Sequence, residues 1–219
     1  PEGLPIVMTL ILATGVWRMS KRNALVKELQ AVEALGQANV IAVDKTGTIT
    51  RNELVIQQVW VDGLLYRIDG VGYEPKGEVR LNDAVIDPVE SAGLLYAGKC
   101  AAFCASGRAL YSEEESRWRV TGDPTEAAMF VFGQKIGFHK DNLERTSPLI
   151  GEIPFDYRLK YHGTLHNHEG KNFLTIVGAP EEVLKLSNTI WRGGTHNSLE
   201  KRDREEIEKV IAEMSSKAL

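Results

Sequence analysis

Residues 40–48 read Val-Ile-Ala-Val-Asp-Lys-Thr-Gly-Thr, an apolar run that passes directly into a carboxylate and a short polar turn. The run predicts a buried strand of an open α/β sheet, and such sheets bind ligands at the carboxyl ends of their strands. Thr46, Gly47 and Thr48 supply backbone N–H groups and hydroxyls that can hold an anion. A carboxylate beside a phosphate cradle indicates that Asp44 is a nucleophile that accepts a phosphoryl group. The alternative is a strand end capped by an ordinary turn.

The composition is that of a soluble globular protein with one or two domains. The chain has 219 residues, of which 43% are hydrophobic and 26% charged, and this suffices for a sizeable core. The net charge of −4 and the even spread of Lys and Arg argue against a nucleic-acid partner. Cys100 and Cys104 lie in an apolar stretch at helical spacing, so we expect reduced core residues on one helix face rather than a disulfide or a metal pair.

The N-terminal segment combines apolar and basic residues in the order typical of a membrane helix. Leu4–Trp17 is apolar and almost uncharged, but its 14 residues are fewer than the roughly 20 that span a bilayer. It runs into a basic cluster, typical of a cytoplasmic membrane boundary, that consists of Arg18, Lys21, Arg22 and Lys27. The prolines and glycine of residues 1–5 predict a break in the helix, where the carboxylate of Glu2 predicts an ion ligand. The alternative is a buried start of a soluble domain.

Residues 44–50, Asp-Lys-Thr-Gly-Thr-Ile-Thr, resemble the phosphorylation motif of P-type cation-transporting ATPases. Residues 1–5, Pro-Glu-Gly-Leu-Pro, resemble the unwound ion-binding segment in the fourth membrane helix of calcium-type pumps, and residues 18–36 resemble the stalk of that family. The resemblance implies that residues 1–17 are the cytoplasmic half of a membrane helix, with Glu2 as a ligand of the transported cation. It favours Ca²⁺, because carboxylate oxygens suit a hard divalent cation.

The same resemblance implies the remaining organisation. Residues 18–37 would be a stalk helix, and residues 38–50 would begin a Rossmann-like phosphorylation domain of the haloacid dehalogenase type. Residues 51–219 would be a C-terminally incomplete nucleotide-binding domain, an α+β fold with a mixed antiparallel sheet and flanking helices. Residues 18–219 would lie on the cytoplasmic side of the membrane.

Local patterns in residues 51–219 also predict an α+β fold, because strand hairpins alternate with helices. Asp62-Gly63 and Glu169-Gly170 predict hairpin turns. Asp123 predicts a helix N-cap with proline at the first helical position. The expected helices are Pro88–Ala105, Pro124–Ile136, Pro180–Leu186 and Ser198–Ser216.

Three segments resemble nucleotide-binding motifs of the family. In Gly-Asp-Pro-Thr-Glu at 122–126, Glu126 would accept a hydrogen bond from the adenine amino group; the alternative is a carboxylate that interacts with the helix dipole. In Pro-Phe-Asp at 154–156, Phe155 would stack on the base; the alternative is a core aromatic residue. In Gly-Ala-Pro-Glu at 178–181, Gly178 would let the backbone approach the nucleotide.

Two departures from the family pattern predict weak ATP binding. Val177 occupies the place of a lysine, so one cationic contact to the nucleotide is lost. Asp156 and Tyr157 occupy the places of a serine and an arginine. Lys160 falls where the family has a basic residue on the phosphate side, so one cation remains.

The mechanism that the resemblance implies is phosphoryl transfer from MgATP to Asp44. Lys45 would offset phosphate charge, and Thr46 would bind Mg²⁺ through its backbone carbonyl and the phosphate through its hydroxyl. Related haloacid dehalogenase hydrolases have an acid/base aspartate at the place of Thr46. Threonine cannot do that proton transfer at neutral pH, so the aspartyl-phosphate should persist, as in a pump.

Two other functions are weighed against the pump. The first is an isolated, non-catalytic ATP-binding fragment, because the chain lacks the Thr-Gly-Glu-Ser and Gly-Asp-Gly-x-Asn-Asp motifs of a complete site. The second is a stand-alone phosphatase, which Thr46 disfavours. The Walker-like spacing of residues 93–99 falls within a helical pattern and is discounted. His162, His166 and His168 alternate on a strand, and we expect surface histidines rather than a metal site.

Overall fold

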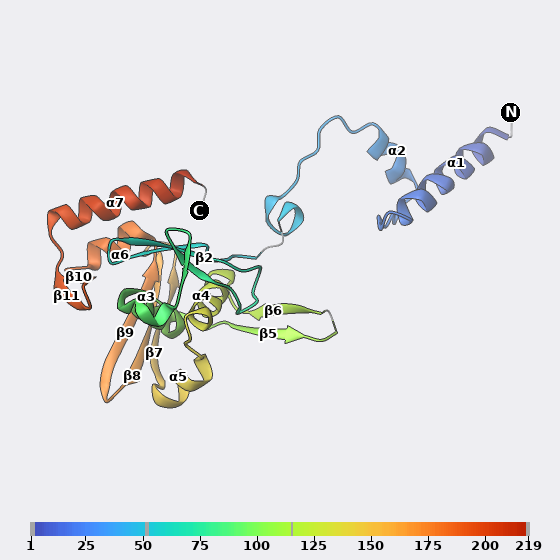
Figure 1. Cartoon of the computed structure of the whole chain (residues 1–219). Coiled ribbons are helices and arrows are strands. Elements are labelled where there is room, and N and C mark those ends of the chain that lie inside the picture. Colours follow the sequence, from blue (N-terminus) through green and yellow to red (C-terminus); the bar gives the residue numbers. More distant parts are fainter. Residues whose placement is uncertain (1–2, 51–52, 115, 218–219) are drawn as a thin grey trace. The chain divides into compact units, whose positions relative to one another are not determined.

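The computed structural model describes residues 3–50, 53–114 and 116–217. The chain divides into two compact units, Pro1–Arg51 and Asn52–Leu219 (Figure 1). Each unit is described by itself.

The first unit begins with helix α1 (Gly3–Ser20). The expected break at the prolines does not reach Pro5, which lies in the first turn, where the missing N–H costs no intrahelical bond. By length and composition α1 could cross a membrane, and its side chains are not buried within the protein. Glu2 lies outside the described residues.

The stalk segment is interrupted rather than one continuous helix. Asn23 has φ 60°, the left-handed conformation that ends helices. The N–H of Ala24 donates to Met19 O at 3.0 Å and that of Asn23 donates to Ser20 O at 3.0 Å, the paired bonds of a Schellman motif. A second helix, α2 (Gln30–Gly36), follows and ends at the glycine, as expected.

The predicted strand over residues 40–43 is not formed. Val40 and Ile41 are 84% and 83% exposed, and the fully described segment 38–44 has no strand assignment. A parallel strand obtains its hydrogen bonds and its burial from neighbouring strands and helices, and the described part of the chain offers none that pair with it. A short π-helical turn, Lys45–Ile49, follows Asp44.

The core of the second unit forms where α3 (Ala92–Cys104) packs on α4 (Pro124–Lys135). A Cβ added to Gly133 would lie 2.8 Å from Cβ of Ala102, closer than real side-chain atoms approach. The two helices therefore pack at this distance only with glycine at 133. The fully or almost fully buried apolar residues around this contact include Tyr66, Leu94, Ala127, Val131 and Ile136.

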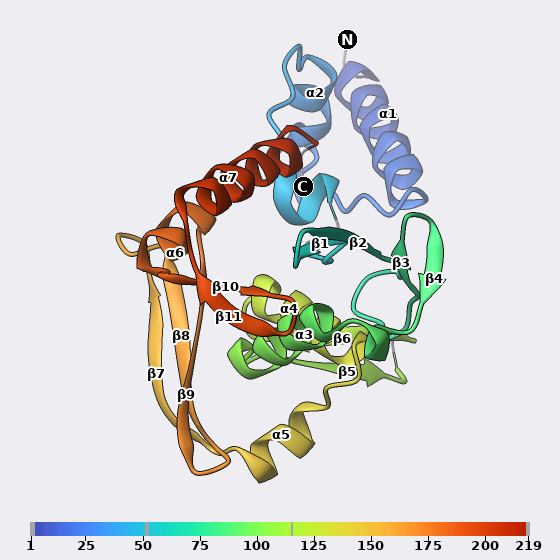
Figure 2. The same cartoon turned by 60° about the vertical axis from the view of Figure 1, so that its left-hand side comes forward.

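A three-stranded antiparallel sheet has the order β7-β8-β9 (Figure 2). Two of its strands, β8 and β9, contact α3. Its strands are β7 (Leu149–Asp156), β8 (Tyr161–His168) and β9 (Lys171–Gly178). Glu169 and Gly170 join β8 to β9 with φ 52° and 74°, so the predicted hairpin turn is confirmed.

A four-stranded antiparallel sheet has the order β1-β2-β3-β4. Its strands are β1 (Gln58–Val61), β2 (Leu64–Ile68), β3 (Val79–Leu81) and β4 (Ala84–Ile86). The first turn, Asp62-Gly63, has φ 55° and 76°, as predicted. The second, Asn82-Asp83, has φ 51° and 65° and was not anticipated. Both have the positive φ values that type I′ hairpins require.

The remaining elements complete the second unit. The strand pairs are β5 (Arg108–Ser112) with β6 (Arg117–Thr121), and β10 (Thr189–Arg192) with β11 (Thr195–Ser198). The helices are a 3₁₀ turn Pro88–Glu90, α5 (Lys140–Thr146), α6 (Pro180–Leu186) and α7 (Lys201–Ser216). The α+β class is as predicted, with several small antiparallel sheets in place of one mixed sheet.

Candidate functional site

A pocket of about 640 Å³ lies beside the start of α4 and the adjoining ends of β7, β8 and β9. It is lined by all four residues expected to bind a nucleotide, Glu126, Phe155, Lys160 and Gly178. The other lining residues are Asp123, Thr125, Tyr157, His162, Val177 and Ala179. The fold therefore brings together three segments that are separated by up to fifty residues in the sequence.

The first wall of the pocket is the N-terminal turn of α4. The Asp123 carboxylate accepts from the N–H of Thr125 at 2.8 Å and from that of Glu126 at 3.4 Å, and Pro124 occupies the first helical position. This is a full N-cap, which satisfies two of the otherwise unpaired N–H groups. The cap holds Glu126 in the first turn.

The Glu126 carboxylate has a second attachment outside its own helix. Oε2 accepts from the backbone N–H of Ser106 at 3.2 Å and also from the Ser106 hydroxyl. Oε1 takes no hydrogen bond from any described residue. One carboxylate oxygen is therefore anchored, and the other is available to a ligand.

The second wall is the end of β7 together with the loop that joins it to β8. Oδ1 of Asp156 accepts from the N–H groups of Arg158 and Leu159 at 2.6 and 3.0 Å, so this residue closes the turn. Phe155 is 53% exposed, on the pocket wall rather than in the core. The Tyr157 ring meets it edge-to-face at 5.3 Å. The pocket thus offers an accessible pair of aromatic rings.

The third wall is the end of β9. A Cβ on Gly178 would lie 2.3 Å from the carbonyl oxygen of Lys160 and 2.4 Å from Cβ of Tyr161. Strand packing alone therefore requires glycine at 178. The neighbouring N–H of Ala179 donates to Lys160 O at 2.8 Å and fixes this corner.

The charges on the pocket wall are few. Asp123 and Glu126 are acidic, and Lys160 is the basic residue among those that line it. Val177 contributes an apolar surface where the family pattern has a lysine. The wall is thus mainly apolar and aromatic, with two carboxylates and the one cation of Lys160 among the residues that line it.

The three histidines of β8 correct one expectation. His162 and His166 are only 8% and 7% exposed, so the prediction of surface histidines is wrong for both. Their rings face the C-terminal end of α3: His162 Nε2 lies 3.3 Å from Cys104 O, and His166 Nε2 lies 3.1 Å from Phe103 O. The alternation of these histidines along one strand is as predicted, but the face of β8 that carries His162 and His166 is buried.

Two other expectations concern α3. Residues 93–99 lie inside this helix, so their Walker-like spacing makes no phosphate loop. Cys100 and Cys104 are free thiols on it, as predicted. Burial raises the pKa of each thiol to about 11.

The phosphorylation motif lies in the first unit. Asp44 and Lys45 are exposed there and are not among the residues that line the pocket. The Thr46 side chain lies outside what the structure describes, as does Glu2.

Sequence reasoning missed Ser106. It lies 20 residues before Glu126, directly after α3, and carries no motif of its own. A Ser-Gly pair after a helix is an ordinary loop signal, so only the folded arrangement shows its contact.

The second unit is an α+β domain with a pocket at which Glu126, Phe155, Lys160 and Gly178 meet. The chain belongs to the P-type ATPases: residues 96–219 match the family model described as "P-type ATPase, cytoplasmic domain N". It is 35% identical over 220 residues to a calcium-transporting ATPase of Bacillus subtilis. It is 36% identical over 219 residues to the probable cation-transporting ATPase F of Mycobacterium tuberculosis. It is 35% identical over 228 residues to the human calcium-transporting ATPase type 2C member 1.

These alignments cover 100% of this chain and 24% of each relative. The chain therefore spans about a quarter of the length of these relatives.

Proposed function

We propose that the chain is part of an ATP-driven cation pump, in which the second unit binds ATP and Asp44 accepts the γ-phosphoryl group. The observation that carries this proposal is the convergence of Glu126, Phe155, Lys160 and Gly178 on one pocket. Three unrelated segments with acceptor, aromatic and cationic groups at one place suit a purine nucleotide.

In this proposal Phe155 stacks on the adenine, and Glu126 Oε1 accepts from its amino group. Lys160 meets the phosphates. Because Val177 supplies no charge, we expect ATP affinity to be weaker than in a pocket with a second cation, by about the 1.5–3 kcal/mol of a charged hydrogen bond.

The phosphorylation step uses the first unit. An Asp44 oxygen attacks the γ-phosphorus, and the bond to the bridging oxygen of the ADP leaving group breaks as the new P–O bond forms. Lys45 offsets the phosphate charge. Asp44 and the Thr46 carbonyl would hold a Mg²⁺ ion that accompanies ATP, because they provide the oxygen donors that this ion prefers, and the ion would supply neutralisation of phosphate charge. Thr46 supplies no base for water, so the aspartyl-phosphate persists.

Membrane attachment and transport follow from the same proposal. Residues 1–17 would lie in the membrane, with residues 18–37 as the stalk, residues 38–50 as the start of the phosphorylation domain and residues 51–219 as the nucleotide-binding domain on the cytoplasmic side. Glu2 would be a ligand of the transported cation. Ca²⁺ is favoured, because two of the relatives named above are calcium-transporting ATPases.

A second function is favoured by one specific observation. The pocket is formed within the second unit, whereas the residues before Asp44 are exposed and unpaired by any described strand. The 219-residue chain by itself would then bind ATP without turnover. A phosphatase is disfavoured by Thr46.

Nucleotide titration of the chain tests the binding part. We expect measurable ATP binding that weakens with Phe155→Ala and with Lys160→Ala. Sub-micromolar binding that is indifferent to Lys160→Ala would contradict both the weakness and the role of Lys160.

Labelling with γ-³²P-ATP tests the nucleophile in the complete protein that carries this chain. We expect acid-stable labelling of the wild type and none of Asp44→Asn. Equal labelling of the two proteins would refute Asp44 as the acceptor.

A further inference from the structure

We propose that Ser106 and Lys140 are positioning residues that orient Glu126 for recognition of the adenine amino group. This inference rests on the proposed ATP site. Neither residue lines the pocket, and both act through Glu126.

The first step is the hydrogen bonding of Ser106 to the carboxylate of Glu126. Its N–H and its hydroxyl both donate to Oε2 of Glu126. Two donors that converge on one oxygen restrict the rotation of the carboxylate, which leaves Oε1 as the acceptor for a ligand.

The second step is the hydrogen bonding of Lys140 to the segment that contains Ser106. Lys140 Nζ donates to the carbonyl of Ala105 at 2.6 Å and lies 3.5 Å from that of Gly107. In a trans peptide the C=O of Ala105 and the N–H of Ser106 point in opposite directions. An ammonium that holds the carbonyl on one side therefore fixes the N–H on the other side, towards Glu126.

The segment packs closely against the end of β6 and touches the first turn of α4. A Cβ on Gly107 would lie 2.7 Å from Thr121 O, too close for a real side chain, and 3.5 Å from Ala127 N, an ordinary contact. Gly107 therefore lies directly against the backbone of Thr121 and in contact with the start of the helix that carries Glu126. Small displacements of Ser106 would pass directly to the carboxylate.

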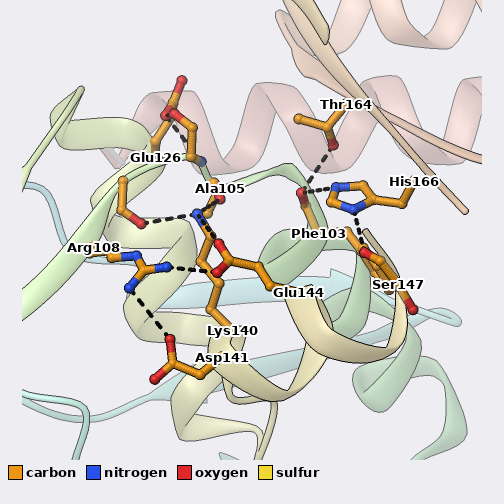
Figure 3. A network of polar contacts seen from close by, with 12 residues as sticks. Phe103, Ala105, Arg108, Glu126, Lys140, Asp141, Glu144, Ser147, Thr164 and His166 are labelled. Carbon is orange, nitrogen blue, oxygen red and sulfur yellow. Dashed lines mark hydrogen bonds and ion pairs between the residues drawn. The ribbon is translucent and has the colours of Figure 1, made fainter. Parts of the chain in front are cut away.

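Lys140 is itself held in place. Only 12% of its side chain is exposed, and Glu144 lies 3.9 Å from its ammonium. Arg108 contacts the same carboxylate at 2.7 Å and Asp141 at 3.5 Å. Burial lowers the pKa of Lys140, and Glu144 opposes that shift. The cation thus belongs to a charge network of α5 and Arg108 of β5 that fixes its position (Figure 3).

The orientation matters for the choice of base. A carboxylate oxygen accepts from the amino group of adenine but repels the carbonyl oxygen that hypoxanthine has at the same place. If Glu126 is free to rotate, this discrimination decreases, whereas stacking on Phe155 is unaffected.

The test compares ATP with ITP by calorimetric titration of the full chain. We expect the wild type to bind ATP more tightly than ITP. Ser106→Ala and Lys140→Met should each lower ATP affinity by roughly three- to tenfold, the effect of a weakened charged hydrogen bond. The affinity for ITP should not change in either variant. Ser106→Thr and Lys140→Arg retain a donor and should restore the preference. Phe155→Ala is the control and should weaken both nucleotides equally.

The outcomes separate the two proposals. A wild type that does not prefer ATP, or a preference that survives Glu126→Gln, would overturn the proposed adenine site. A preference that is lost in Glu126→Gln but fully kept in Ser106→Ala and Lys140→Met would overturn the positioning role alone. Ser106 is exposed, so Ser106→Ala should fold. If Lys140→Met fails to fold, Ser106→Ala decides the question.

Discussion

The Nε2 atom of His166 lies 3.1 Å from the carbonyl oxygen of Phe103, so an inward-facing side chain of β8 caps the C-terminal end of α3. Thr164 donates to the same carbonyl at 3.0 Å, and His162 lies 3.3 Å from Cys104 O. Lys140 completes the set at Ala105 O. The last carbonyls of a helix lack intrahelical donors, and here four side chains provide them. The sheet and the main core helix are thereby joined by polar contacts as well as by packing.

We expect His166→Ala to destabilise the second unit by about 1–3 kcal/mol, because it removes the ring N–H from between the buried carbonyls of Phe103 and Ser147 and opens a cavity beside Phe103. Urea unfolding followed by circular dichroism measures the change. His139→Ala is the matched control, because His139 is exposed and makes no capping bond. Equal effects of the two substitutions would contradict the capping role.

Val177→Lys should strengthen ATP binding by about tenfold or more, since it adds a second cation to a pocket in which Lys160 is the one lysine or arginine among the described lining residues. The affinity should also become more dependent on salt, whereas adenosine binding should stay the same. Leu174→Lys, on the same strand but outside the pocket lining, controls for added charge. A gain that is equal in both variants would show a general electrostatic effect.

Gly178→Ala should destabilise the chain by about 1–3 kcal/mol, because its methyl group would meet the backbone of Lys160 and Tyr161. Gly151→Ala in β7 is a suitable comparison: its nearest contact would be an ordinary 3.7 Å from Leu165. Thermal unfolding should separate the two variants. If Gly178→Ala leaves the thermal stability unchanged, the backbone where the start of β8 meets the end of β9 must be able to move apart at little cost, and the packing argument is wrong.

Stability should fall as the pH rises above about 9, the region where an unfolded thiol ionises. Burial raises the pKa of Cys100 and Cys104 to about 11, so the folded chain keeps both protonated while the unfolded chain loses the protons. This contribution is complete below pH 9 and is lost between about pH 9 and 11. A Cys100→Ala/Cys104→Ala variant should show a shallower fall. Burial lowers the pKa values of Lys135 and Lys140, and this contribution makes the folded state more stable as the pH rises. It is the same in the wild type and in the cysteine variant, so it cancels in the comparison.

Local signals predicted the local structure well. The turns at Asp62-Gly63 and Glu169-Gly170 and the cap at Asp123 each depend on a few neighbouring residues, and each formed as expected. The run at 40–43 has an equally clear local pattern, but a strand there needs partners that the described residues do not supply. Local pattern is therefore sufficient where the interaction is local and insufficient where it is not.

The candidate site shows the same division. The helical position of Glu126 could be predicted from Asp123 and Pro124, and the grouping of Glu126 with Phe155 came from the family resemblance. The contact with Ser106 could not be predicted, because it joins residues 20 apart through the packing of α3 on α4. The buried face of β8 likewise depends on the position of α3, which no alternation of residues within the strand encodes.

Lys160 has φ 57°, a left-handed conformation that lysine adopts at a cost of roughly 1 kcal/mol relative to glycine. Lys160→Gly should therefore make the fold more stable while it removes the cation from the pocket. The preferred residue at this position differs for folding and for ligand binding, which is a stability–function trade-off at a single residue. Selection of this domain for thermal stability alone should favour glycine at 160, and selection for nucleotide affinity should retain lysine.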